Sequence, residues 1–329
     1  MLPEKFSTFR YTEFLICDGA LHRIMVSLFS ILGRENMNFT SLGISALTSI
    51  PSFCLCIYVF HKDKVEKEPF HLLAMLFAAG AVMYFPASYV ERFIGIQLSS
   101  VFSSEISYSL SGVAVYSSSS VRLLYYGIVS FAGVAIVEEG LKWLAMYLIT
   151  HKSRHFDCLF DGVIYGVFTA FGYAVMENLS YAWDGGWDTL LLRMLASLPG
   201  HICFGVIMGC FYTLWRLHYL LKQMEKRYAQ EIGITVTEPF RSGGWMMLSI
   251  FASVLLHGVY CFMNLLSADG ATVVFVAFMA MLFVICLYTI QKLSCSDEYN
   301  EDIIERCIRQ KYPQILMDQK KNKKDEGGL

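Results

Sequence analysis

The chain has 329 residues, of which 55% are hydrophobic and only 16% are charged, and its mean hydropathy is +0.48. This composition excludes an ordinary soluble domain, and a net charge of −2 gives no reason to expect a nucleic-acid partner. The ten cysteines are scattered without a CxxC pair, so neither a disulfide scaffold nor a cysteine metal site is predicted.

Apolar runs of the length of a membrane span recur along the chain. A spanning helix needs about 20 predominantly apolar residues. We predict seven spans, at 39–60, 70–90, 122–149, 158–182, 190–215, 244–266 and 271–292. The expected fold class is therefore all-α, a polytopic membrane helix bundle with about seven transmembrane helices in contact with the lipid bilayer.

Charge divides the chain into three regions. Residues 1–38 form an N-terminal extension of unknown role, in which charged residues interrupt every apolar run. Residues 39–292 form the membrane-embedded domain, with a polar linker at 216–243, and residues 293–329 form a polar tail. We expect the linker and the tail to lie in the cytoplasm.

The distribution of Lys and Arg predicts the orientation of the bundle. Loops 61–69 and 150–157 carry Lys or Arg, as do the linker and the tail, whereas loops 183–189 and 267–270 carry Asp and neither Lys nor Arg. Because cytoplasmic loops are enriched in Lys and Arg, we expect a multi-pass protein of the cell membrane with a cytoplasmic C-terminus. The four basic residues of the N-terminal extension are the exception.

The third span carries three ionisable residues within five positions, Glu138, Glu139 and Lys142. A charge at the centre of a membrane helix costs about 2.5–3.5 kcal/mol even on insertion scales, so such residues are functional candidates. Glu138 and Lys142 are four apart and share a helix face, which is also what a purely structural ion pair would need. Glu139 lies about 100° around the helix, and we expect one carboxylate to lack a local partner and to be available as a general base.

Near its end the fourth span carries Tyr173 and Glu177, which are four positions apart, followed directly by Asn178. Glu177 is either part of a buried site or an interfacial carboxylate at the outer end of the helix. Asp161 opens this span, and we expect it to cap the helix rather than to act in catalysis.

Two histidines lie in later spans, His201 in the fifth and His257 in the sixth. A single membrane histidine is most often an interhelical hydrogen bonder. These two lie at similar depth, roughly 13 Å from the outer face at about 1.5 Å per residue, which favours a shared site with Glu177. The same estimate places Glu138 deeper below the outer face than the two histidines, by up to about 10 Å.

Two hydrolytic chemistries suit these groups. In one, Glu177, His201 and His257 bind Zn²⁺ and leave a position for water, while Glu138 or Glu139 acts as base. In the other no metal is present, a pair of glutamates activates water, and a histidine with Asn or Lys donors stabilises the oxyanion. The sequence lacks HExxH, GxSxG and paired membrane aspartates, which disfavours the standard zincin, serine and aspartyl routes.

Short motifs that carry these residues occur in a fixed order. Glu138-Glu139-Gly-Leu-Lys142 reads EExxK, and Tyr173-Ala-Val-Met-Glu177 reads FxxxE with Tyr for Phe. A histidine in the next helix and an HxxxD motif in a late helix would complete the pattern.

His201 supplies the third element, and His257 supplies the histidine of the fourth, where Cys261 stands in place of Asp. Segments 62–69 and 161–166 add two further matches. At these residues the chain resembles the PrsW family of membrane proteases, part of the superfamily that includes the CAAX-processing proteases.

The resemblance implies an intramembrane endopeptidase whose partner is a membrane-anchored protein substrate. Some members of the family cut anti-sigma factors in a site-1-type cleavage. It also implies catalytic roles for five residues, Glu138, Glu139, Glu177, His201 and His257. From their positions beside these residues, we expect supporting roles for Lys142, Asn178 and Asn264. Asn264 is the residue we expect to replace the missing aspartate.

Two other interpretations use the same residues. An ion- or proton-coupled transporter would also place acids and histidines in adjacent helices, although no inverted repeat of broken spans is visible. A non-catalytic scaffold on the same fold is the second, and the retained glutamates argue against it. The substrate, the oligomeric state and the choice between zinc and glutamate-only chemistry stay open at this level.

Overall fold

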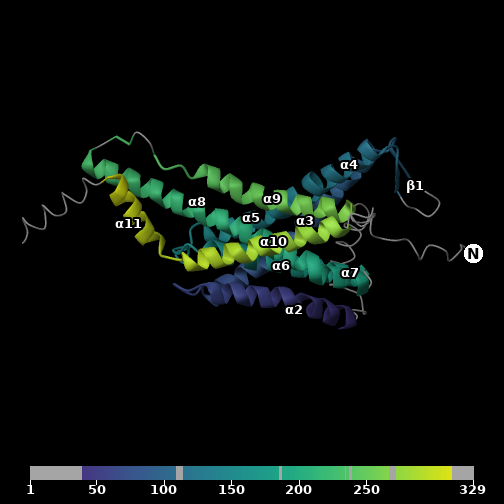
Figure 1. The fold of residues 1–329 in the computed structure, drawn as a ribbon, viewed down its shortest axis with the longest axis horizontal. Coiled ribbons are helices and arrows are strands. Elements are labelled where there is room, and N and C mark those ends of the chain that lie inside the picture. The colour runs from purple at the N-terminus through teal and green to yellow at the C-terminus, as the bar shows by residue number, and fades with distance from the viewer. Residues whose placement is uncertain are drawn as a thin grey trace, which may run out of the picture.

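The computed structural model describes residues 39–312, apart from 109–113, 185–186, 234, 237–238 and 267–271. The predicted N-terminal extension lies outside the described residues. Figure 1 shows long helices side by side along the long axis of the molecule, with a small hairpin beyond α4 at one end and α11 at the other. The predicted all-α class is confirmed.

The helical elements follow one another with short connections. They are α2 (Phe39–Lys62), α3 (Phe70–Val101), α4 (Ser119–Ile128), the π-helix η1 (Val129–Ala135), α5 (Ile136–Thr150), α6 (Asp161–Asp184), α7 (Trp187–Leu192), the π-helix η2 (Arg193–Ser197), α8 (Leu198–Ile232), α9 (Gly243–Leu266), α10 (Thr272–Cys295) and α11 (Asn300–Lys311). Six helical stretches of the described chain are long and apolar enough to cross a membrane. The protein is therefore a multi-pass membrane protein.

Helix α6 is the central element of the bundle, and it is not one of those six stretches. Its 24 residues suffice to cross a bilayer, but most of them are buried against α2, α3 and α8 rather than facing lipid. Small residues permit this packing. A Cβ atom added at Gly166 would overlap the backbone of Gly205 in α8, and one added at Gly172 would overlap the carbonyl of Phe77 in α3.

Two elements extend beyond their predicted bounds. Helix α3 runs to Val101, eleven residues past the predicted end at 90, so Glu91 lies within the helix and not in a loop. The Ser-rich segment after it contains strands β1 (Ile106–Tyr108) and β2 (Ala114–Tyr116), which pair antiparallel with Ile106 opposite Tyr116.

Helix α8 continues to Ile232, through more than half of the predicted linker. Beyond α10, the amphipathic α11 packs Ile304 and Ile308 against Leu217 and Leu221 of α8. Hydrophobic burial therefore attaches the first part of the polar C-terminal region to the bundle. Residues after 312 lie outside the described chain.

Candidate active site

The two glutamates of the first motif stand directly after a π-helix. Because η1 ends at Ala135, Glu138 and Glu139 fall in the first turn of α5, where both are buried. π-Helical turns inside α-helices are frequent at functional sites. Here the turn precedes two carboxylates that are 4% and 0% exposed.

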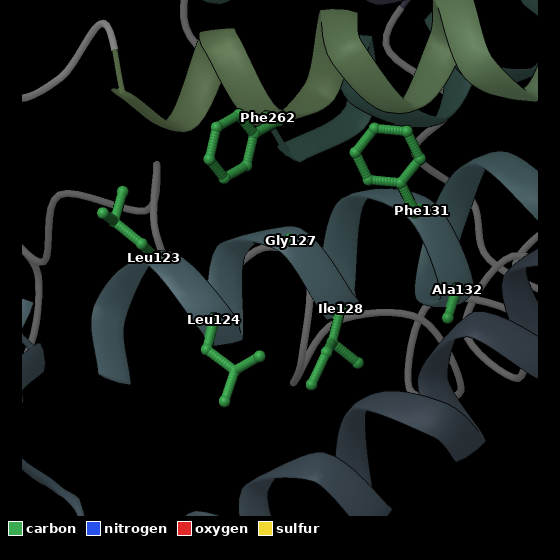
Figure 2. Close-up of a pocket in the computed structure, with 7 residues that line it drawn as sticks. All are labelled: Leu123, Leu124, Gly127, Ile128, Phe131, Ala132 and Phe262. Carbon is green, nitrogen blue, oxygen red and sulfur yellow. The ribbon is translucent and has the colours of Figure 1, made fainter. Parts of the chain in front are cut away.

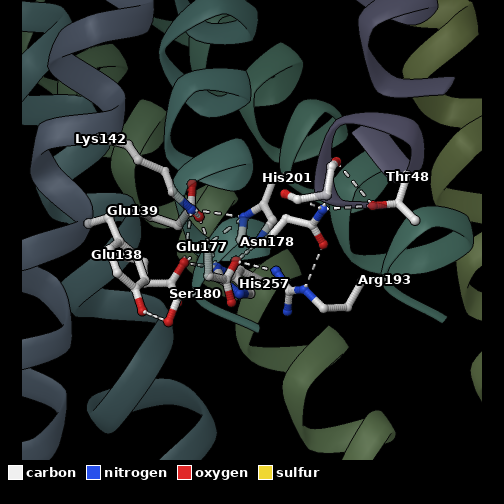
Figure 3. Close-up of polar contacts among 12 residues, drawn as sticks. Thr48, Glu138, Glu139, Lys142, Glu177, Asn178, Ser180, Arg193, His201 and His257 are labelled. Carbon is white, nitrogen blue, oxygen red and sulfur yellow. Dashed lines mark hydrogen bonds and ion pairs between the residues drawn. The ribbon is translucent and has the colours of Figure 1, made fainter. Parts of the chain in front are cut away.

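Lys142 joins three groups at the centre of the bundle (Figure 3). Its ammonium donates to Glu138 Oε2 at 3.0 Å, to Glu139 Oε1 at 2.8 Å and to His201 Nδ1 at 2.9 Å. The expectation that one of the two carboxylates lacks a local partner is wrong, because Lys142 reaches Glu138 at i−4 and Glu139 at i−3 together. Glu139 Oε2 is nevertheless buried without a hydrogen-bond partner among the described residues.

The contacts of His201 determine which of its ring nitrogens carries a proton. An ammonium can only donate, so Nδ1 of His201 accepts from Lys142. The other nitrogen, Nε2, then carries the hydrogen and donates to Glu177 Oε2 at 2.9 Å. His201 thus links the lysine of α5 to the glutamate of α6 as a neutral imidazole.

Glu177 is held by a cation that the sequence analysis did not single out. Arg193 of η2 lies 2.8 Å from Glu177 Oε2 and 4.0 Å from the centroid of the Tyr181 ring. Its Nε donates to Asn178 Oδ1 at 3.4 Å. An arginine inside the apolar run 190–215 was the available signal.

Asn178, predicted as a supporting residue, connects Arg193 to α2. Its side-chain amide donates to Thr48 Oγ1 at 2.8 Å and to the carbonyl oxygen of Ser45 at 3.3 Å. Asn178 is fully buried, so these bonds fix its orientation. Asn178 therefore lies behind Glu177 as seen from the centre, and its bond to Nε positions Arg193.

His257 approaches the same centre from α9. Its Nδ1 lies 2.8 Å from Glu139 Oε1, and its ring stacks on Phe204 with centroids 4.8 Å apart. The Cys261 side chain contacts the His257 ring, one helical turn further on. Cys261 thus makes the contact for which Asn264 was proposed, and Asn264 is an exposed residue.

Two further residues belong to the site: Glu91, which the sequence analysis missed, and Tyr173, to which it assigned no role. The ring of Tyr173 lies 4.1 Å from Lys142 Nζ, a cation–π distance, so the residue that replaces Phe in the second motif faces the charged centre. Glu91 of α3 interacts electrostatically with Glu138 and Glu177, and its Oε1 is buried without a partner among the described residues. Its signal in the sequence was a Glu-Arg pair immediately after an apolar run.

The donor atoms that converge on one point belong to Glu138, Glu139, His201 and His257, and all lie within 4.8 Å of one another. This set differs from the predicted zinc ligands, because Glu177 binds the far nitrogen of His201 and pairs with Arg193. Two imidazoles and two carboxylates are ligands that Zn²⁺ accepts, and one carboxylate, Glu139, has the unpartnered oxygen Oε2. Lys142 Nζ lies among the same atoms, so its ammonium and a metal ion compete for them.

A separate groove lies on the outside of η1 (Figure 2). It is lined by Leu123, Leu124, Gly127, Ile128, Phe131, Ala132 and Phe262, from α4, η1 and α9. Phe131 also packs against Gly258, the residue after His257. The groove is apolar, so it suits lipid chains or an apolar segment, and the polar chemistry belongs to the buried centre.

The structure brings together all five residues predicted to be catalytic, from four helices that are distant in sequence. A multi-pass helix bundle with acids and imidazoles gathered around a buried lysine is the arrangement expected of an intramembrane hydrolase. The sequence matches the family described as PrsW family intramembrane metalloproteases over residues 68–288. The chain belongs to this family, and it is a membrane protease.

The similar proteins are bacterial and share the family name. The chain is 25% identical over 242 residues to Protease PrsW of Oceanobacillus iheyensis, which covers 74% of this chain and 92% of that protein. It is 27% identical over 212 residues to Protease PrsW of Bacillus subtilis, covering 64% and 78%. It is 32% identical over 154 residues to Protease PrsW of Halalkalibacterium halodurans, covering 47% and 62%. No solved structure matches the chain.

Proposed function

We propose that the protein hydrolyses peptide bonds of membrane-anchored protein substrates at the centre formed by Glu138, Glu139, Glu177, His201 and His257. The observation that carries the proposal is the convergence of four metal-ligating or acid–base groups within 4.8 Å inside a membrane bundle. Anti-sigma factors, cut in a site-1-type cleavage, are the substrate class that the resemblance favours. A non-catalytic scaffold would not need the orphaned carboxylate oxygen of Glu139, and the family match does not support a transporter.

The ligands we propose for Zn²⁺ are Glu139, His201 and His257, three of the four converging groups, which leaves the fourth coordination position for water. When bound, the ion would polarise the scissile carbonyl and make water a stronger nucleophile at neutral pH. Glu177 acts from behind, because its bond to His201 Nε2 orients the ring so that Nδ1 faces the centre. Glu139 Oε1 lies 2.8 Å from His257 Nδ1, so these two proposed ligands contact each other directly at the centre.

The residues of this chain also provide for the proton and for the developing charge. Glu138 Oε2 is bonded to Lys142, and the side chain is 5% exposed, the larger exposure of the two glutamates on α5. We therefore assign Glu138 as the base that takes a proton from the attacking water. Lys142, freed from one of its acceptors, donates to the oxyanion of the tetrahedral intermediate.

The position of Lys142 supports glutamate-only hydrolysis as a second candidate. Its ammonium uses the oxygens and the imidazole nitrogen that an ion would need. In that chemistry the Glu138 and Glu139 pair activates water without a metal, and Lys142 is the electrophilic group.

Metal content distinguishes the two chemistries. The purified protein should contain one Zn²⁺ per chain, and His201→Ala and His257→Ala should each abolish zinc binding. Glu177→Gln should lower the zinc affinity about 10–100-fold, because Glu177 orients a ligand without binding the ion itself. Zinc is measured by mass spectrometry of the metal after dialysis. Wild-type protein that cleaves its substrate without zinc would overturn the metal assignment.

Cleavage tests the proposal as a whole. Glu138→Gln should abolish cleavage of a co-expressed membrane-anchored substrate, and Glu301→Gln, an exposed carboxylate of α11, should leave it unchanged. Undiminished cleavage by Glu138→Gln would remove the active site from this centre.

A further inference from the structure

A second group of buried carboxylates lies at the opposite end of α6 from the active site. Asp161 is the first residue of α6 and Glu177 is sixteen positions later, roughly 24 Å along a helix at about 1.5 Å per residue. Around Asp161 gather the loop between α2 and α3, the loop before α6, and the turn between α10 and α11. This is the end of the bundle where α11 lies in Figure 1.

The geometry of Asp161 is not that of a helix cap. Its Oδ2 accepts from the backbone amides of Asp157 at 3.0 Å and Cys158 at 2.6 Å, both in the loop before the helix. The expectation that Asp161 caps α6 is therefore wrong. Its Oδ1 is buried and has no hydrogen-bond partner among the described residues.

Glu68 faces the same point from the loop before α3. Tyr165, one turn after Asp161 on the same face of α6, donates to Glu68 Oε1 at 2.8 Å. Glu68 is 6% exposed, and its Oε2 is a second oxygen without a partner in the described chain. Glu68 and Asp161 lie close enough to repel each other, and Asp63 and Asp157 repel both.

The acids of this cluster differ from a solvated acidic surface in their burial. Asp63 is 1% exposed, and burial raises its pKa to about 6, although the charge of Lys67 lowers it. Glu68, Asp161 and Asn300 are likewise 6%, 1% and 2% exposed. Buried carboxyl groups without a counter-charge either hold protons or lie next to a cation that is not a side chain.

Two basic side chains near the cluster, Lys67 and Arg216, are bonded elsewhere. Lys67 donates through Nζ to the backbone carbonyls of Phe60 and Asp63. Arg216 donates through Nη1 to the carbonyl of His151 at 2.9 Å. The hydrogen bonds of Lys67 and Arg216 thus end at carbonyl oxygens, and neither side chain donates to Glu68 or Asp161.

Two carboxylates of the cluster are close enough to share one ion. Asp157 and Asp161 each offer an oxygen within 4.8 Å of the other, together with the sulfur of Cys158, and the charge of Glu68 acts on Asp161 from the loop before α3. Asn300 lies beside them, because its backbone amide donates to the Asp157 carbonyl at 2.7 Å, and both polar atoms of its buried side chain are unpartnered in the described chain. Carboxylate and amide oxygens are the ligands of hard cations.

We propose that this end of the bundle binds one hard divalent cation, Mg²⁺ or Ca²⁺, through oxygens of Glu68, Asp157 and Asp161. The ion would join the loop before α3 to the start of α6. Asp297 adds a third connection, because its Oδ1 accepts from the Phe160 amide at 3.0 Å and so attaches the α10–α11 turn to the same place. The site is independent of the metal proposed for the active centre.

Ion binding to the full-length protein in nanodiscs tests the site. After EDTA treatment, equilibrium dialysis should show one saturable Mg²⁺ or Ca²⁺ per chain, in wild type and in His201→Ala alike. Glu68→Gln and Asp161→Asn should each weaken binding at least about tenfold. Glu66→Gln, an exposed acid of the same loop, is the matched control and should bind as wild type.

The unfolding temperature provides a second measurement on the same samples. The ion should raise it in wild type and in Glu66→Gln, and should leave Glu68→Gln and Asp161→Asn unchanged. Should Asp161→Asn fail to fold, Glu68→Gln carries the test. Absence of saturable binding in wild type, retention of it in Glu68→Gln, loss of it in His201→Ala, or binding of Zn²⁺ alone would each overturn the proposal.

Discussion

All three protons of the Lys142 ammonium are used, two on glutamates and one on a histidine. A buried charge is tolerated only when its partners are close and well oriented, and removing one partner leaves the others uncompensated. Lys142 therefore contributes both to stability and to the protonation state of His201. Its effects can be separated, because both glutamates bond to the lysine but only Glu138 carries the proposed proton transfer.

Lys142→Met should abolish cleavage and lower stability by about 3–5 kcal/mol, because two buried carboxylates lose their counter-charge. Thermal unfolding in detergent measures the loss. Adding Glu139→Gln to Lys142→Met should restore much of the unfolding temperature but not the activity. A single Lys142→Met variant with wild-type unfolding temperature would contradict the buried ion network.

Arg193→Met should reduce the cleavage rate about 10–100-fold while the protein still folds, because Glu177 then holds His201 less firmly. The rate constant for cleavage of a fixed substrate measures this change. Arg227→Met, an exposed arginine of α8, is the control. If both variants cleave at the same rate, Arg193 has no role in positioning the site.

At the scale of elements, α6 depends on close backbone contact with its neighbours. Gly166 faces Gly205 of α8, and Gly172 faces the Phe77 carbonyl of α3. These contacts set the distance between the helix that carries Glu177 and the helix that carries His201. The 2.9 Å bond between the two side chains follows from that distance.

Gly166→Ala should destabilise the protein by about 1–3 kcal/mol, because the added methyl group overlaps the Gly205 carbonyl and forces α6 and α8 apart. It should also lower cleavage. Gly127→Ala is the matched control, since a Cβ there has no neighbour within 4 Å. The unfolding temperatures of the two variants give the comparison, and equal values would contradict the close packing.

At the scale of the whole molecule, the two polar centres lie at opposite ends of the central helix. The active site contains the fourth residue of α8 and the acidic cluster the first of α6. If the positively charged loops face the cytoplasm, the acidic cluster is on the cytoplasmic side and the active site is toward the outer face. That placement suits cleavage of a substrate near its outer end.

Topology reporters test this orientation. A fluorescent protein fused after residue 329 should fluoresce in the cytoplasm, and alkaline phosphatase fused at the same point should be inactive. A phosphatase fused at the Ser-rich hairpin between α3 and α4 should be active. The reverse pattern would invert the predicted orientation, which rests on the Lys and Arg distribution alone.

The sequence by itself determined the membrane spans, the family and the principal residues of the centre, because long apolar runs and charges inside them are local properties of the chain. It placed Glu138, Glu139, Glu177, His201 and His257 in spans that do meet. It proposed Asn264 as the partner of His257, whereas Cys261 makes that contact, and it ended α3 eleven residues early.

The tertiary structure alone decided how the charges are paired. Lys142 reaches His201 across 59 positions, Arg193 compensates Glu177, and Glu91 joins the centre from a helix predicted to end before it. Spacing along one helix shows which side chains share a face, but the partners of a buried charge come from neighbouring helices, and their approach is set by packing.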